Sequence, residues 1–266
     1  MHGRRLLLAV FVGWFCCAGR AEDFSTLNRD HLARFKQLLE AKSRPVRILS
    51  FGDSMADSFR SPTYELLARL DQEFGAVGFS FNNYRNTLGI ALTNGAELSL
   101  PNTNWFTRFF TLPPDGAVWW ERELSPGGNR CDRAGLFYVA SPQGGTVTLS
   151  ISTNVGPWGT LLTLDSYSPA AVGCFTNVAL APNFHRVRAQ SLVGTNLVLG
   201  PFVELSETNG IHISFMDWGG ISLSDVTHVP RSIRDPIMAA LKPDLLIWHM
   251  KESPAVVDHQ QSAQRM

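Results

Sequence analysis

Charge is scarce in this sequence, and neither sign predominates. Only 17% of the 266 residues are charged, and 23 basic residues balance 23 acidic ones. No run of five like charges occurs. A protein that binds nucleic acid or an anionic membrane surface normally carries a basic excess or a basic patch. The composition therefore predicts no nucleic-acid partner. The 44% share of hydrophobic residues is typical of a folded globular chain.

Cysteine is also rare, with four in the chain, and no motif has the spacing of a metal site. Because Cys-x-x-Cys and His-x-x-x-His are both absent, we expect no zinc site and no other cofactor. Cys131 and Cys174 are the cysteines beyond the N-terminal region. In an oxidising compartment they could form a disulfide, and two buried free thiols are the alternative. The sequence leaves both open.

Long apolar runs are absent except for a short one near the N-terminus. Arg4 and Arg5 precede the apolar stretch Leu6–Cys17, and small residues lead up to Ala21. This pattern predicts a signal peptide over residues 1–21 and a secreted or periplasmic protein. An uncleaved anchor is the alternative, which the short apolar run disfavours. We expect no stable membrane span once the signal is removed.

Both ends of the remaining sequence alternate between helical and strand-like patterns. Apolar residues at helical spacing predict helices, and short apolar runs bounded by turn residues predict strands. The predicted helices cover 25–42, 64–74 and 233–241, and the predicted strands cover 45–49, 210–217 and 245–250. This order of strands and helices is typical of an α/β fold.

The middle of the chain, residues 79–207, has a different character. Helical periodicity disappears, and β-like runs recur about every ten residues with Gly, Pro and Asn between them. This pattern predicts a β-sandwich or jelly-roll module. Four tryptophans of this region are candidates for stacking on sugar rings, and the alternative is that each is a core aromatic. They are Trp105, Trp119, Trp120 and Trp158.

The most informative stretch is Gly52-Asp53-Ser54, which follows the first predicted strand. A helical pattern begins within about ten residues of it. A serine where a parallel strand turns into a helix stands at the carboxyl end of the sheet, where ligands bind in open α/β folds. Free N–H groups at the helix N-terminus can stabilise a developing oxyanion. Ser54 is therefore a candidate nucleophile.

Together with two later segments, this tripeptide resembles the SGNH (GDSL-like) hydrolase family. Gly219-Gly220 follows the second predicted strand, and Pro243–Ile247 matches the start of the third. The resemblance covers residues 45–80 and 208–253, with the β module between them. It implies an α/β, flavodoxin-like three-layer core with an inserted module. We therefore expect a core over 22–78 and 208–266, interrupted by the module at 79–207.

The resemblance also implies roles for individual residues. Ser54 matches the family's nucleophile, and Gly220 matches the glycine whose N–H contributes to the oxyanion hole, with Gly219 as the alternative register. The segment Phe74–Phe79 looks like one found in SGNH proteins that act on acetylated cell-wall or capsular glycans. An acetylated carbohydrate, or another small ester, is therefore the expected substrate.

Two departures from the family pattern concern catalysis. Glu252 stands where the family has an oxyanion-hole asparagine, and a carboxylate there would repel an oxyanion. The late Asp-x-x-His block is missing from the C-terminal end, where Asp258 and His259 are adjacent. Asp225 and His228 are the one pair with the right spacing, and they are the candidate base. The alternative is a capping aspartate beside an exposed histidine.

Both departures fit a chain that is a truncated copy of a longer enzyme. An incomplete sheet would leave its last strand, 245–250, partly uncovered. The sequence thus predicts a secreted SGNH-type serine esterase that removes O-acetyl groups from carbohydrate. The alternatives are a catalytically impaired glycan-binding protein and an SGNH-type O-acyltransferase that passes the acyl group to a sugar hydroxyl.

Overall fold

A computed structural model describes most of the chain between Arg29 and His249. The described residues are 29–52, 69, 73, 77–82, 87–99, 109–122, 132–152, 156–179, 186–204, 210–217 and 229–249. They are mostly β-strand, with two helices. The elements are α1 (Arg29–Ala41), β1 (Val46–Gly52), β2 (Val77–Asn82), β3 (Thr87–Thr93), β4 (Glu97–Ser99), β5 (Phe109–Leu112), β6 (Ala117–Arg122), β7 (Arg133–Ala140), β8 (Thr146–Ser152), β9 (Gly159–Asp165), β10 (Val172–Ala179), β11 (Arg186–Val193), β12 (Asn196–Glu204), β13 (Ile211–Asp217), α4 (Arg231–Leu241) and β14 (Leu245–His249).

Four strands form a parallel sheet in the order β2-β13-β1-β14. The three strands that we expected are β1, β13 and β14, and they lie side by side with β1 in the middle. The expectation of only three strands was wrong, because β2 is a fourth. Val77, Phe79 and Phe81 alternate with small or polar residues, which is a strand pattern.

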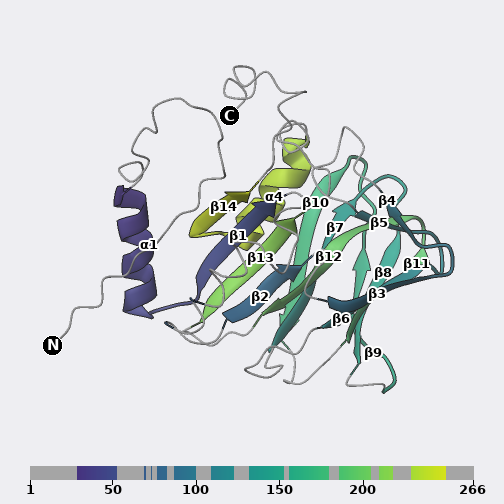
Figure 1. Cartoon of the computed structure of the whole chain (residues 1–266). Helices are drawn as coiled ribbons and strands as arrows, with labels where there is room; N and C mark the ends of the chain where they lie inside the picture. The colour runs from purple at the N-terminus through teal and green to yellow at the C-terminus, as the bar shows by residue number, and fades with distance from the viewer. Residues whose placement is uncertain are drawn as a thin grey trace, which may run out of the picture.

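Helices cover both faces of this parallel sheet (Figure 1). Val46 and Ile48 of β1 pack against Phe35 and Leu39 of α1. Leu49 is fully buried on the opposite face, in the cluster that contains α4. The alternation follows from the period of two in a strand, and a strand that is covered on both faces is apolar on both.

The parallel sheet continues without a break into an antiparallel one. β12 pairs with β2 through Phe202 and Phe81, and β7 and β10 follow in the order β10-β7-β12-β2. A second sheet, β3-β6-β11-β8-β9, packs against the antiparallel part to form a sandwich (Figure 1). Fully buried Val118, Leu136 and Leu149 fill the space between the two sheets. The described residues between 87 and 204 contain no helix, which confirms the expected β character of this region.

One hydrophobic cluster joins the parallel part to the sandwich. Leu49 of β1 lies in it together with Phe137 of β7 and Phe202 of β12, and α4 contributes Ile233 and Ile237. α4 therefore covers both parts, and its presence confirms the predicted helix at 233–241. The division of the chain at 78/79 and 207/208 remains a prediction.

β14 is an edge strand of the described sheet, with β1 as its partner. The Leu246 side chain is 48% exposed. This confirms the expectation that the last strand is partly uncovered. Cys174 on β10 is a free cysteine, so it forms no disulfide here, and Cys131 lies outside the described residues. Of the helices in the described part, neither is long and apolar enough to cross a membrane.

Candidate functional site

The carboxyl ends of β13, β1 and β14 meet at one edge of the sheet. Gly52, the last residue of β1, lies opposite Asp217 of β13 on one side and His249 of β14 on the other. Because neighbouring strands are about 4.8 Å apart, Asp217 and His249 are about 10 Å apart at their backbones. The fold therefore brings an acid and a histidine to the point where the chain leaves β1.

The four predicted site residues, Ser54, Gly220, Asp225 and His228, lie outside the described residues. Two peptide units join Ser54 to Gly52, so covalent geometry keeps the two Cα atoms within about 7 Å of each other. The assignments of nucleophile, oxyanion donor and base stay predictions. Sequence reasoning did not pair Asp217 with His249, although both lie at or next to the end of a predicted strand.

A buried histidine elsewhere on the sheet is too far away to belong to this edge. His212 is only 2% exposed, and it lies opposite Arg47 near the other end of β1. Five residues separate that position from Gly52, which corresponds to about 16 Å along a strand. His212 is therefore too far from the end of β1 to act as the base for Ser54.

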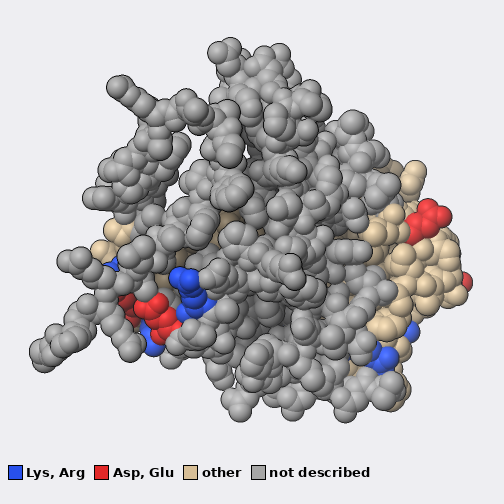
Figure 2. All heavy atoms as spheres, in the orientation of Figure 1, with Lys and Arg blue, Asp and Glu red and all other residues tan. Residues whose placement is uncertain are grey.

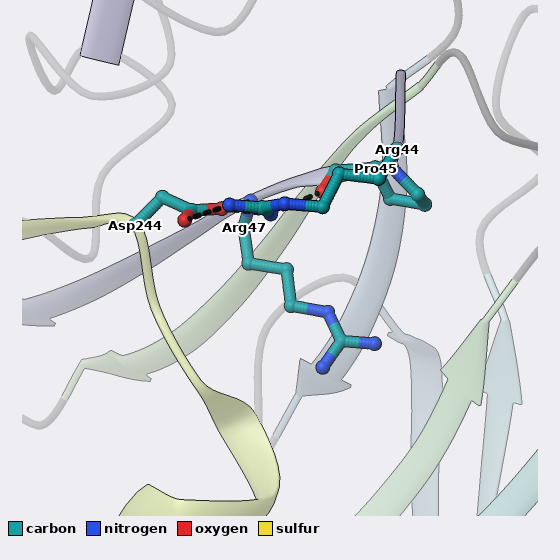
Figure 3. A network of polar contacts seen from close by, with 4 residues as sticks. All are labelled: Arg44, Pro45, Arg47 and Asp244. Carbon is teal, nitrogen blue, oxygen red and sulfur yellow. Dashed lines mark hydrogen bonds and ion pairs between the residues drawn. The ribbon is translucent and has the colours of Figure 1, made fainter. Parts of the chain in front are cut away.

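An ion pair fixes the start of β14 against the start of β1 (Figure 3). The Arg44 guanidinium donates from Nη1 to Asp244 Oδ2 at 2.7 Å and from Nη2 to Oδ1 at 2.6 Å. The Arg47 backbone N–H donates to Asp244 Oδ2 at 3.0 Å, and the Asp244 N–H donates to the Arg47 carbonyl at 2.7 Å. In Figure 3 the Arg47 side chain extends away from this carboxylate. These contacts set the register that places His249 beside Gly52.

The pKa of Asp244 responds to two opposing effects. Burial alone would raise it, but the hydrogen bonds from Arg44 and from the Arg47 backbone, with the nearby positive charges, hold the pKa below its ordinary value. The same hydrogen bond raises the pKa of Arg44. The pair is therefore charged on both sides at neutral pH, and it stabilises the folded state.

The described tryptophans of the sandwich divide into two kinds. Trp120 is 2% exposed and packs edge-on against Phe110, with ring centroids 5.4 Å apart, so it is a core residue. Trp119 and Trp158 are half-buried, and Trp105 lies outside the described residues. Two half-buried rings therefore remain as candidates for ligand contact.

Metal-binding side chains do not cluster in the part of the chain that the structure describes. No group of three or more His, Cys, Asp or Glu residues lies together there.

Comparison with solved structures gives one substantial likeness. A peptidoglycan O-acetylesterase structure aligns over 88% of this chain with a TM-score of 0.57 and 18% identity. The chain spans 65% of the length of that esterase. At this identity the likeness concerns the fold alone, and it supports the SGNH-like fold that the sequence led us to expect.

A weaker likeness involves a carbohydrate-binding module. A family 29 module complexed with mannohexaose aligns over 50% of this chain and 92% of its own length, at 16% identity. Its TM-score of 0.37 is too low to bear on fold or function. No family model and no curated protein matches the chain.

Proposed function

We propose that this protein is an SGNH-type serine esterase that removes O-acetyl groups from carbohydrate. The observation that carries the proposal is the strand order β13-β1-β14. The chain goes from β1 to one side and later to the other, which makes the carboxyl end of β1 a topological switch point. The Gly52-Asp53-Ser54 motif leaves β1 at that end. The fold likeness to an O-acetylesterase is a second support.

The proposed core has the strand arrangement of a flavodoxin-like three-layer fold around β1. In that fold the first strand lies between the second and third, as β1 lies between β13 and β14. α1 and α4 on opposite faces correspond to the outer layers. The proposed leader at residues 1–21 would bring this protein to an extracellular or periplasmic glycan.

In the proposed reaction the Ser54 hydroxyl attacks the ester carbonyl. Its proton passes to a histidine, and the N–H groups of Ser54 and Gly220 stabilise the oxyanion. The bond between the acyl carbon and the sugar oxygen then breaks. The histidine gives its proton to that oxygen, and the sugar leaves with a free hydroxyl. Water, deprotonated by the same histidine, then releases acetate and regenerates the Ser54 hydroxyl.

Two histidines are candidates for the base. His228 has the Asp-x-x-His spacing with Asp225. His249 is favoured by the register of β14, which places it opposite Gly52 with Asp217 on the far side of β1. Single replacements by glutamine separate the two, because loss of the base costs far more activity than loss of a neighbouring histidine.

The test is hydrolysis of p-nitrophenyl acetate and of an O-acetylated oligosaccharide by the full chain. We expect Ser54→Ala to lower kcat about 10³-fold or more, and Ser58→Ala, in the same segment, to have little effect. Equal activity in the wild type and Ser54→Ala would rule out the proposal.

A catalytically impaired glycan-binding protein is the second candidate function. Glu252 at the asparagine position favours it, as do the half-buried Trp119 and Trp158. This candidate predicts glycan binding without hydrolysis by the wild type.

A further inference from the structure

Two arginines project from the outer face of the second sheet of the sandwich. In β11, Val187 and Ala189 are buried in the core between the sheets. Arg186 and Arg188 alternate with them and are half-buried on the other face. The alternation of a strand thus places two guanidinium groups side by side on one surface.

Two indole rings lie against these arginines. Trp119 of β6 lies across the ladder from Arg188, and Trp158 directly precedes β9. The guanidinium carbon of Arg188 is 4.7 Å from the centroid of the Trp158 ring. The guanidinium carbon of Arg186 is 5.0 Å from Trp158 and 5.8 Å from Trp119. We call these four residues the Trp–Arg cluster.

The two arginines differ in how their hydrogen-bonding groups are used. Arg186 donates from Nη2 to Ser152 Oγ at 3.0 Å and to the Gly156 carbonyl at 3.3 Å. Glu121 lies across the ladder from Arg186. Arg186 is therefore held in place by the sandwich itself.

Arg188 has no comparable support. Like that of Arg186, its Nε is buried and has no hydrogen-bond partner among the described residues, and Arg188 lacks the Nη2 hydrogen bonds that Arg186 makes. Its cross-strand neighbours, Trp119 and Ser150, are uncharged. Burial lowers the pKa of Arg188, and no carboxylate of the described residues offsets that effect. A half-buried guanidinium without an anion is unfavourable, and a bidentate carboxylate is its best partner.

We propose that the Trp–Arg cluster binds a carboxylate-bearing sugar of an acidic glycan. The sugar carboxylate accepts hydrogen bonds from Arg188, and Trp119 or Trp158 stacks on the C–H face of the sugar ring. This inference rests on the proposed function and adds that the glycan is negatively charged. A neutral glycan would leave Arg188 without an anion.

A nucleic acid is the competing ligand for such a cluster, because bases also stack on aromatic rings beside arginines. A nucleic-acid strand needs a basic track along its backbone. The net charge of the chain is zero. Figure 2 shows the Lys and Arg atoms of the described residues on one face as small separate patches. The charge distribution therefore favours a local carboxylate over a polyanion.

The experiment measures binding by calorimetry, with the full chain and probes that carry no acetyl ester. The probes are hexagalacturonate, hyaluronan octasaccharide, fully methyl-esterified hexagalacturonate and a single-stranded oligonucleotide. We expect at least one acidic oligosaccharide to bind, and the esterified form to bind about tenfold more weakly or not at all. The acidic probes carry no ester, and the methyl-esterified probe is measured on Ser54→Ala, so that binding is measured independently of esterase activity.

The decisive variant is Arg188→Gln. We expect it to weaken binding about tenfold or more, with Arg188→Lys in between because lysine lacks the planar fork. Arg34→Gln, an exposed arginine on α1, removes the same charge and is expected to bind like the wild type. Thermal unfolding of each variant checks that it is folded. If Arg188→Gln does not fold, Arg188→Lys and the salt dependence of wild-type binding decide.

The outcomes separate this inference from the proposed esterase. Binding that depends on Arg188 supports the inference even if p-nitrophenyl acetate is not hydrolysed. The inference is wrong if neither acidic oligosaccharide binds, if the esterified probe binds equally well, if Arg188→Gln binds like the wild type, or if only the oligonucleotide binds. Each of these results would contradict the inference whether or not the protein hydrolyses p-nitrophenyl acetate.

Discussion

The Arg44 guanidinium makes two parallel hydrogen bonds to the Asp244 carboxylate, and it thereby joins the approach to β1 to the start of β14. The Asp244 side chain is 13% exposed and that of Arg44 is 48% exposed. The carboxylate also accepts the Arg47 N–H. A partly buried carboxylate with three donors contributes more than a surface ion pair.

We expect Asp244→Ala to lower the free energy of unfolding by about 1–3 kcal/mol, because it leaves the Arg47 N–H and the Arg44 guanidinium without their acceptor. Asp235→Ala is the matched control. The Asp235 side chain is 59% exposed and pairs with its neighbour Arg234, so we expect a change within about 0.5 kcal/mol. Urea denaturation measures both variants. Equal losses of stability in the two variants would show that the Asp244 contacts contribute no more than a surface ion pair.

The same carboxylate predicts a pH dependence of stability. The pKa of Asp244 is lower in the folded state than its ordinary value. Its contribution is therefore complete above the unfolded-state pKa of about 4 and is lost as the pH falls through the lower folded-state pKa. The stability difference between the wild type and Asp244→Asn should be constant from pH 7 to about pH 5 and should shrink below about pH 4. A difference that grows on acidification would contradict this assignment.

The sequence predicted those parts of the fold that local patterns determine. The spacing of Ile233, Ile237 and Leu241 identified α4, and a β-like run over residues 146–151 identified β8. The fusion of the two sheets through Phe81 and Phe202 was not predictable, because these residues are far apart in sequence and no local signal reports their pairing.

The candidate site was predictable only in part for the same reason. Gly52-Asp53-Ser54 is visible as a motif, but the row of Asp217, Gly52 and His249 depends on strand register. That register is fixed in part by Asp244, five residues before His249. For Arg188 the sequence contains a weak signal, because Arg186 and Arg188 alternate with apolar residues in β11.

A close contact between β10 and α4 predicts an effect at Gly173. A Cβ atom there would lie 2.2 Å from the Ile233 carbonyl oxygen, which is backbone and cannot turn away. We expect Gly173→Ala to cost about 1–3 kcal/mol of stability by forcing α4 away from the sheet. Gly159→Ala is the control, because its nearest atom would be the Ile151 oxygen at 3.9 Å. Thermal or urea unfolding of the two variants provides the comparison, and similar stabilities would contradict the tight packing.

Lys242 caps the C-terminus of α4 and adopts a left-handed backbone conformation with φ of 43°. A side chain is unfavourable in that conformation and glycine is not. We expect Lys242→Gly to raise the free energy of unfolding by about 0.5–1 kcal/mol. Lys36→Gly, in the interior of α1, should lower it by about 1 kcal/mol. Chemical denaturation measures both, and a loss of stability in Lys242→Gly would argue against this cap.

The shared hydrophobic cluster predicts that the parallel part and the sandwich unfold together. Ile237 is fully buried in α4 and belongs to the same cluster as Leu49 of β1 and Phe137 of β7. We expect Ile237→Ala to cost about 2–5 kcal/mol and to destabilise both parts equally. Tryptophan fluorescence, to which Trp119, Trp120 and Trp158 of the sandwich contribute, and far-UV circular dichroism should then give one coincident transition in the wild type and in the variant. Two separate transitions, with only one shifted by Ile237→Ala, would mean that the sandwich folds on its own and that α4 stabilises one part alone.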